Sequence, residues 1–229
     1  MAKRQHAHDD SCSRSGGTMT TTRITPLVRV VMASSAAFVL LAAMALDTKV
    51  VKIGSKADVP SNVFSPEKYG ALEFPKVVAA VESHATDAAT LAAAITADQT
   101  AAETKYGIAA DAGAEFPVKF TGKVGKQDSG IYDVVVPGVP DAIHISVQTG
   151  PAIIGTDLRD GTGLISFGQF RNQIEYQNAG SALNKEMKKQ VLSKIGTTDL
   201  TGKTISVVGV FQLTDPTAWI VAPVKLDIQ

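Results

Sequence analysis

The chain has 229 residues, with 22 basic and 22 acidic side chains and a formal net charge of zero. A neutral chain lacks the basic surface that releases counterions from phosphate, so the composition argues against nucleic-acid binding. The sequence contains no cysteine after Asp47, which excludes disulfides from the remaining residues. Those residues are numerous enough for one folded domain.

The first 29 residues form a polar leader, rich in Ser, Thr and His and without an apolar period. This composition predicts disorder. His6, His8 and Cys12 are residue types that can bind a metal ion. Nothing near them in the sequence would hold them in the fixed geometry that a metal site needs. No metal site and no cofactor are therefore predicted. Met19 is an alternative start codon to Met1.

Seventeen consecutive residues, Val30–Leu46, carry no charge. This length lies between a secretory apolar region and the roughly 20 residues that a membrane helix needs. Three interpretations stay open: a signal sequence cleaved after Ala45, an uncleaved membrane anchor, and a buried core helix. Five basic residues precede the run and three follow it closely, which favours a cytoplasmic N-terminus. We expect a single inner-membrane span with the C-terminal domain in the periplasm.

Residues 47–64 are expected to form an extended connector, and residues 65–107 a helical hairpin. A second helix start is expected at Pro75, because proline is favoured in the first turn of a helix. In the alanine-rich stretch that follows, Thr86 or Asp87 is expected to cap a new helix.

Beyond the hairpin the apolar period changes from helical to alternating, which predicts strands. The expected strands are residues 116–124, 131–137, 141–148, 203–213 and 219–228. A long helix from Asn172 to Ile195 separates the third strand from the fourth. Its apolar positions include Leu183, Met187 and Val191, which recur at helical spacing and are expected to face the core.

Three strands, a helix and two strands is the order of the OB-type five-stranded barrel. The predicted fold class is therefore α+β, with the membrane helix, the helical hairpin and an OB-like antiparallel barrel over residues 108–229. The long helix would close the barrel between strands three and four. An open antiparallel sheet packed on helices is the alternative.

The densest polar and glycine-rich region is Gly150–Tyr176, which joins the third expected strand to the long helix. Arg159, Asp160, Asn172 and Gln173 are the candidate ligand-binding residues within it. A helix N-terminus offers free N–H donors, and an arginine adds a planar fork of donors beside them. The competing interpretation is structural: Asn172 and Gln173 would cap the helix, and Arg159 would pair with Asp160 to fix the loop.

Catalysis is the second alternative for this region. Asp157, Asp160 and Glu175 could supply the two carboxylates that glycoside hydrolysis needs at a set separation across the sugar. Asp160 is followed by Gly-Thr-Gly, however, which is ordinary turn chemistry. We expect no enzymatic activity, and no catalytic residue is assigned.

The chain resembles a family of predicted bacterial periplasmic lipoproteins of unknown function, often found near sugar ABC-transporter genes. The resemblance covers most of the chain from about Val50. The residues that carry it are Ile53-Gly54, Gly150-Pro151, Gly155-Thr156, Leu158-Arg159-Asp160, Phe167, Phe170, Asn172-Gln173-Ile174, Leu183-Asn184 and Leu200–Leu213. The chain departs from the family pattern where the lipid-bearing cysteine would stand, because it has Ala45-Leu46-Asp47 there.

The resemblance implies a periplasmic location and sugar-transport neighbours, and it implies no reaction. Together with the export segment, it leads us to expect a membrane-tethered, non-catalytic accessory or binding protein. Its expected partners are the inner membrane and either sugar ABC-transporter components or a small polar ligand. A small periplasmic hydrolase acting on glycosides or esters is the alternative function. Neither the ligand nor the oligomeric state can be named from the sequence.

Overall fold

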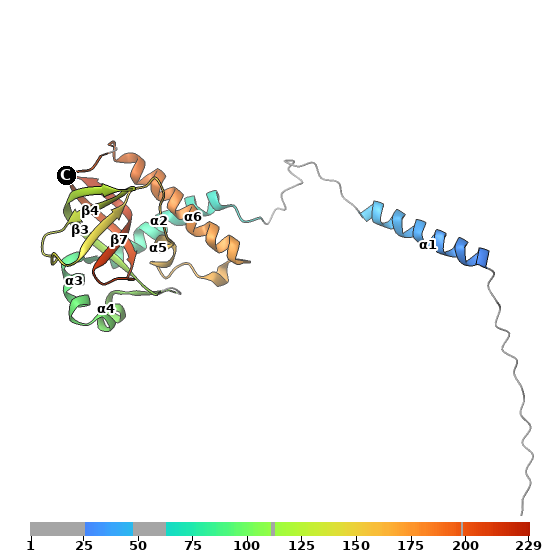
Figure 1. Cartoon of the computed structure of the whole chain (residues 1–229), viewed down its shortest axis with the longest axis horizontal. Helices are drawn as coiled ribbons and strands as arrows, with labels where there is room; N and C mark the ends of the chain where they lie inside the picture. The colour runs from blue at the N-terminus through green and yellow to red at the C-terminus, as the bar shows by residue number, and fades with distance from the viewer. Residues whose placement is uncertain (1–25, 48–62, 111–112, 198) are drawn as a thin grey trace, which may run out of the picture. The chain divides into compact units, whose positions relative to one another are not determined.

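The structure is a computed structural model that describes residues 26–47, 63–110, 113–197 and 199–229. The leader predicted to be disordered and the connector predicted to be extended lie largely outside the described residues, so neither prediction is tested. The chain divides into two units, Met1–Ser61 and Asn62–Gln229, and each is treated by itself. Figure 1 shows both, with the second unit built from helices packed around a coiled sheet.

The first unit contains one described helix, α1 (Pro26–Asp47), which includes the whole uncharged run. Within it, Val30–Asp47 is long and apolar enough to cross a membrane, and none of that window is buried within the protein. This finding gives no support to the interpretation as a buried core helix. A signal sequence and a membrane anchor both remain compatible with this helix.

The second unit begins with α2 (Pro66–His84), which continues without interruption through Pro75. The predicted second helix start at Pro75 is therefore wrong. A proline inside a helix removes one backbone hydrogen bond. In α2 the apolar stripe Phe74, Val77 and Val81 is buried and holds the helix in place on both sides of the proline.

Helix α2 packs against α6 (Gln173–Gln190), the long helix of the domain. The two backbones approach closely at Gly70, where an added Cβ atom would lie 2.8 Å from the carbonyl oxygen of Ala182. A side chain at position 70 would therefore push the helices apart.

The chain then forms β1 (Thr86–Asp87), α3 (Ala88–Ala97) and α4 (Gln99–Tyr106). Asp87 caps α3, as predicted, because its carboxylate accepts hydrogen bonds from the N–H groups of Ala89 and Thr90 at 3.0 and 3.2 Å. The predicted hairpin is wrong, because α3 packs on α4 and the sheet while α2 packs on α6. Helix α2 contacts both α6 and the sheet, so its apolar stripe is buried without a hairpin partner.

One sheet contains all the described strands of the domain. Besides β1 they are β2 (Ile108–Ala110), β3 (Gly113–Asp128), β4 (Ile131–Val135), β5 (His144–Gln148), β6 (Thr204–Gln212) and β7 (Ala218–Ile228). Pairing runs from β3 through β4, β5 and β7 to β6, and β6 also pairs with β3. The pairs β1–β3 and β5–β7 are parallel, and the others are antiparallel.

The sheet is therefore mixed and has seven strands, so it is not the closed five-stranded antiparallel barrel that the sequence predicts. Strands β5 and β7 can run parallel because a long connection containing α6 and β6 separates them. Strands β1 and β2 are too short to show an alternating pattern, and they form by adding to the long strand β3. The α+β class is confirmed, and α6 lies between β5 and β6.

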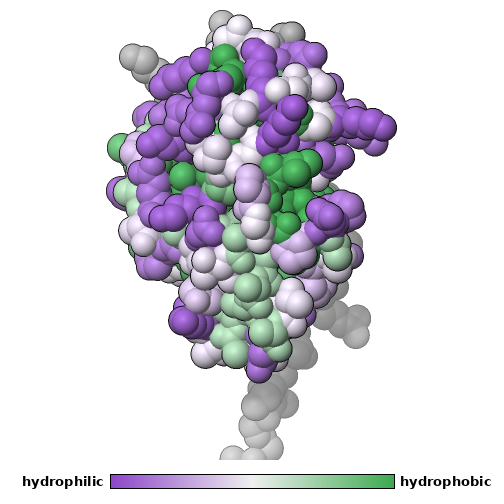
Figure 2. Space-filling model, turned by 90° about the vertical axis from the view of Figure 1, so that its left-hand side faces the viewer, coloured by the Kyte–Doolittle hydropathy of each residue, from purple (hydrophilic) through white to green (hydrophobic). Residues whose placement is uncertain are grey.

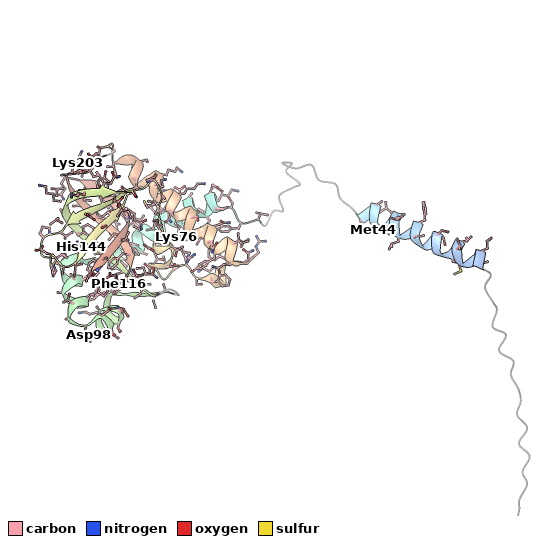
Figure 3. All side chains as sticks on the ribbon, viewed as in Figure 1. Met44, Lys76, Asp98, Phe116, His144 and Lys203 are labelled. Atoms are coloured by element: carbon pink, nitrogen blue, oxygen red, sulfur yellow. The ribbon has the colours of Figure 1, made fainter. Side chains whose placement is uncertain are left out.

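Strand β3 and helix α6 supply much of the core. Phe116, Val118 and Phe120 alternate along β3 and are buried, and Figure 3 places Phe116 among the strands of the domain. Leu183 and Met187 of α6 are fully buried, as predicted. Trp219, the only tryptophan, is also fully buried and stacks on Phe211 with 4.7 Å between ring centroids.

Helix α6 ends earlier than predicted. It gives way after Gln190 to a 3₁₀ turn, η2 (Leu192–Lys194), instead of continuing to Ile195. Tighter 3₁₀ turns are common at helix ends, where the last carbonyl groups lack helical partners. Val191, 9% exposed, still closes the buried stripe of the helix.

Candidate functional site

The polar centre of the glycine-rich region is an ion pair between neighbouring residues of the short helix α5 (Asp157–Asp160). Arg159 donates from Nε to Oδ1 of Asp160 at 2.7 Å and from Nη2 to Oδ2 at 2.8 Å. The two side chains are only 9% and 12% exposed. A two-pronged, largely buried pair of this kind is strong and directional.

Tyr176, in the first turn of α6, joins this pair from the other side. The guanidinium carbon of Arg159 lies 3.6 Å from the centroid of the Tyr176 ring, and Arg159 Nη1 donates to the Tyr176 carbonyl at 3.2 Å. The Tyr176 hydroxyl donates to Asp160 Oδ1 at 3.1 Å. These contacts hold α5 against the start of α6. We name Thr156, Arg159, Asp160 and Tyr176 the α5–α6 clamp.

The carboxylate of Asp160 has little capacity left for a ligand. Oδ1 accepts from Arg159 and Tyr176, and Oδ2 accepts from Arg159 and from the Thr156 hydroxyl at 2.6 Å. Each oxygen thus has two donors, which is the usual number for a carboxylate oxygen. Burial alone would lower the pKa of Arg159, but the bonds to Asp160 and its charge raise that pKa, so Arg159 stays charged.

Asn172 and Gln173, the other two predicted ligand residues, lie at the start of α6 and have different environments. Asn172 is the N-cap, and its side-chain oxygen accepts from the N–H of Glu175 at 2.9 Å. Glu175 in return accepts from the N–H of Arg171 at 3.1 Å and pairs with the Arg171 side chain at 3.2 Å. This pattern resembles a capping box, except that Glu175 accepts from the residue before the N-cap and not from the N-cap N–H. Gln173 is exposed.

Of the four predicted site residues, Arg159 and Asp160 contact each other directly, and Asn172 is connected to them through the first turn of α6. Arg159 and Asp160 contact Tyr176, whose N–H donates to the carbonyl oxygen of Asn172 at 3.2 Å. No hydrogen bond joins Gln173 to the clamp among the described residues. A ligand-binding role for the four stays a prediction, and the contacts favour the structural interpretation.

The three carboxylates considered for hydrolysis face different surroundings. Asp160 lines a cavity of about 360 Å³ together with Phe167 and Tyr176. Asp157 lines a separate cavity of about 250 Å³, between Gly155 and the sheet. Burial raises the pKa of Asp157 to about 6; its own N–H opposes that rise, and the charge of Asp160 adds to it. The Glu175 carboxylate contacts Arg171 at the N-terminus of α6.

Glu115 is a buried acid that the sequence analysis missed. It lies on β3, its side chain is 1% exposed, and its Oε2 atom has no hydrogen-bond partner among the described residues. Burial raises its pKa to about 8, with further contributions from the charges of Asp157 and Asp160, while Arg159 acts in the opposite direction. Its only sequence signal is an acid directly before an alternating apolar strand.

A third cavity, of about 350 Å³, lies beside β4 and the start of β5. Its lining includes Val135, Val139 and Ile143, together with His144. Val135 is 70% exposed, and His144 is exposed to solvent at the start of β5 (Figure 3). The face in Figure 2 is mainly hydrophilic and is interrupted by a compact hydrophobic area.

Within the described parts of the chain, no group of three or more His, Cys, Asp or Glu side chains is arranged to hold a metal ion. Trp219 is buried and donates from its indole nitrogen to the carbonyl oxygen of Pro216 at 3.0 Å.

Comparison with known proteins gives a family and a fold. The profile of a family described as "Predicted periplasmic lipoprotein (DUF2291)" matches residues 35–227. The crystal structure of an OB-fold protein from Thermotoga maritima is similar to the chain, with a TM-score of 0.58 and 20% identity. The alignment covers 73% of this chain and all of that one, and at this identity it shows the fold alone. Among proteins of curated function, none matches the chain.

Proposed function

We propose a periplasmic role for this protein, because the chain belongs to the family of predicted periplasmic lipoproteins, whose profile matches residues 35–227. In this proposal α1 stays in the inner membrane as a single anchor with its N-terminus in the cytoplasm. The domain from Val63 to Gln229 then lies in the periplasm. The excess of basic residues before the apolar run supports this orientation.

The single observation that carries the tether is the apolar helix α1, read together with the position of the only cysteine. Cys12 precedes α1, so no thiol follows the helix to carry a lipid. A member of a lipoprotein family without that thiol needs another attachment to the membrane. An uncleaved α1 supplies it, because a hydrophobic helix anchors a protein far more firmly than a single acyl chain.

Within the periplasm we propose that the domain acts by binding and not by catalysis. Asp160 is saturated by four donors, Glu175 caps α6, and Asp157 lines a cavity of its own. Glycoside hydrolysis requires two carboxylates on opposite sides of one bound sugar. The contacts of these three residues support a structural use of the acids.

We propose that the partner is a component of a sugar-uptake system, which the chain engages through the apolar cavity around Val135, Val139 and Ile143. The size of this cavity, and a lining that combines apolar residues with Lys126, Asp133 and Asp141, suit the side chains of another protein. Val135, 70% exposed, is the most accessible apolar position there for a chemical probe.

Two measurements on the full chain test this function. Alkaline phosphatase fused after Gln229 should be active, and a fusion that is inactive while a cytoplasmic reporter at the same point is active would overturn the topology. A photo-crosslinking amino acid at Val135 should capture sugar-permease subunits in intact cells. Leu72, an apolar residue that is 68% exposed on α2, provides the matched control position. Equal capture from the two positions would contradict a role for the cavity.

A small periplasmic hydrolase is the second candidate, favoured by one observation. Asp157 combines a raised pKa of about 6 with a position in the wall of a cavity, and perturbed acids in cavities are typical of active sites. Turnover of glycosides or esters by the full chain, lost in Asp157→Asn and retained in Asp199→Asn, would establish it. Asp199 is a suitable control because it lies in an exposed loop.

A further inference from the structure

Five aromatic rings form a continuous cluster where the starts of α2 and α6 meet. Phe64 contacts Tyr69 and Phe170, with ring centroids 5.3 and 5.7 Å apart. Tyr176 contacts Phe167 and Phe170 at 5.6 and 5.3 Å. We name these five residues and their apolar neighbours the aromatic end of the domain. The clamp shares Tyr176 with this cluster, so the rings are fixed to the fold.

Much of the aromatic end is open to solvent. Its exposed apolar side chains are Val63 (56%), Leu164 (51%), Phe167 (46%) and Ile174 (70%). They come from three segments: the residues before α2, the loop after α5, and the first turn of α6. Grouped exposed apolar side chains of this kind mark a surface that contacts another apolar phase.

The charges around the aromatic end suit an anionic membrane surface. Lys68, in the first turn of α2, is exposed, and the Arg171 side chain is 59% exposed. The neighbouring acids Glu67 and Glu175 face cations, with Lys185 at 3.7 Å from Glu67. Aromatic side chains flanked by Lys and Arg are typical of the membrane–water interface.

Chain connectivity brings the aromatic end within reach of the membrane. Val63, part of this surface, is the first described residue after α1, and only residues 48–62 separate the two. Sixteen residue steps span at most about 55 Å. The chain therefore joins the domain to its membrane helix at the aromatic end itself.

We propose that the aromatic end is a membrane-contact surface, which rests on the lipid headgroups of the inner membrane and orients the domain on it. This inference depends on the proposed tether and adds an orientation to it. In this proposal the α5–α6 clamp also positions the membrane-contact surface, because it fixes Tyr176 and the rings that pack on it. The apolar cavity around Val135 would face away from the lipid.

Positions along β3 support this orientation. Phe167 shares a cavity with Ala110, which pairs with Gly113 at the start of β3. Val135 pairs with Lys123, ten residues further along the same strand. At about 3.3 Å per residue, Gly113 and Lys123 are separated by up to roughly 30 Å of strand. In Figure 1 the first turns of α2 and α6 also lie on the opposite side of the domain from β4.

Depth-dependent quenching in vesicles tests the proposal on the full chain. With Cys12→Ser removing the native thiol, Phe167→Cys and Val135→Cys each carry one environment-sensitive fluorophore. The chains are reconstituted in vesicles of phosphatidylethanolamine and phosphatidylglycerol that contain nitroxide-labelled lipid. We expect several-fold stronger quenching, and a blue-shifted emission, at position 167. Leu164→Cys should behave like Phe167→Cys, and it guards against a local disturbance at position 167.

Each alternative has its own result. Equal quenching at positions 167 and 135 in chains that float with the vesicles would overturn membrane contact and leave the tether intact. Chains that fail to float after a carbonate wash would instead overturn the tether. Emission that shifts at position 167 without lipid quenching, and only at high protein density, would assign the surface to a second copy of the chain and would also overturn the proposal.

Discussion

Asp160 and Glu115 are two largely buried carboxylates that the fold treats in opposite ways. Asp160 accepts four hydrogen bonds and pairs with Arg159. Glu115 is 1% exposed, and its Oε2 atom has no hydrogen-bond partner among the described residues. Burial raises the pKa of Glu115 to about 8, which favours its neutral form near neutral pH. The presence of an Asp or Glu in the sequence therefore predicts neither its charge nor its function. Both depend on the hydrogen-bond donors that surround the carboxylate in the fold.

The largest expected effect comes from breaking the clamp at Asp160. Asp160→Ala leaves the buried guanidinium of Arg159 without its counter-charge, and loss of one partner of a buried pair typically costs about 3–5 kcal/mol. Unfolding of the full chain in detergent can be followed by the fluorescence of Trp219, the only tryptophan. Arg171→Ala, which breaks an exposed pair with Glu175, is the matched control and should cost about 1 kcal/mol or less. Similar losses for the two variants would contradict a buried clamp.

Met187→Ala tests how far the buried face of α6 contributes to the core. Met187 is fully buried, and such a truncation typically costs about 2–5 kcal/mol. Ile174→Ala, on the same helix but 70% exposed, should change the free energy of unfolding by about 0.5 kcal/mol or less. An unchanged unfolding midpoint in Met187→Ala would show that α6 is not part of the core.

Glu115→Gln tests the contrast with Asp160 through the pH dependence of the free energy of unfolding. Because the pKa of Glu115 is raised from 4.5 to about 8 in the folded protein, the folded state binds more protons than the unfolded state between these values. Stability of the native chain should therefore fall as pH rises from about 4.5 to 8. The variant should lose most of this slope and gain about 1–3 kcal/mol at pH 8.5. A pH slope equal to that of the native chain would refute a buried, protonated Glu115.

The smallest expected effect is the loss of the cap at Asn172. Asn172→Ala should cost about 1 kcal/mol, because one N–H group at the start of α6 loses its acceptor. Gln173→Ala should cost less, since the Gln173 side chain is exposed. The reverse order would mean that Gln173, and not Asn172, supports the helix start.

Local patterns predicted much of this fold. The apolar run predicted α1, the helical spacing of Leu183 and Met187 predicted the buried face of α6, and the acid at Asp87 predicted a helix cap. These features depend on residues close together in the chain. The parallel pairing of β5 with β7 and the addition of β1 and β2 to β3 depend on distant segments, which leave no periodic signal.

The same division applies to the candidate site. Arg159 and Asp160 are neighbours in sequence, so their pairing could be predicted, as could capping by Asn172. The part of Tyr176 in the clamp could not, because its spacing indicates only an apolar helix position. Glu115 was missed for a similar reason: its burial beside Asp157 and Asp160 arises from tertiary packing between β3 and the segment around α5.

We propose that Arg159 serves the fold and not the recognition of a partner. The yield of permease crosslinks from a photo-crosslinker at Val135, compared between the native chain and Arg159→Ala, tests this role. The measurement is made at a temperature where Trp219 fluorescence shows both chains folded. We predict an unchanged yield per folded chain, together with a lower unfolding midpoint for the variant. Loss of crosslinks from a fully folded Arg159→Ala chain would contradict the claim and assign Arg159 to binding.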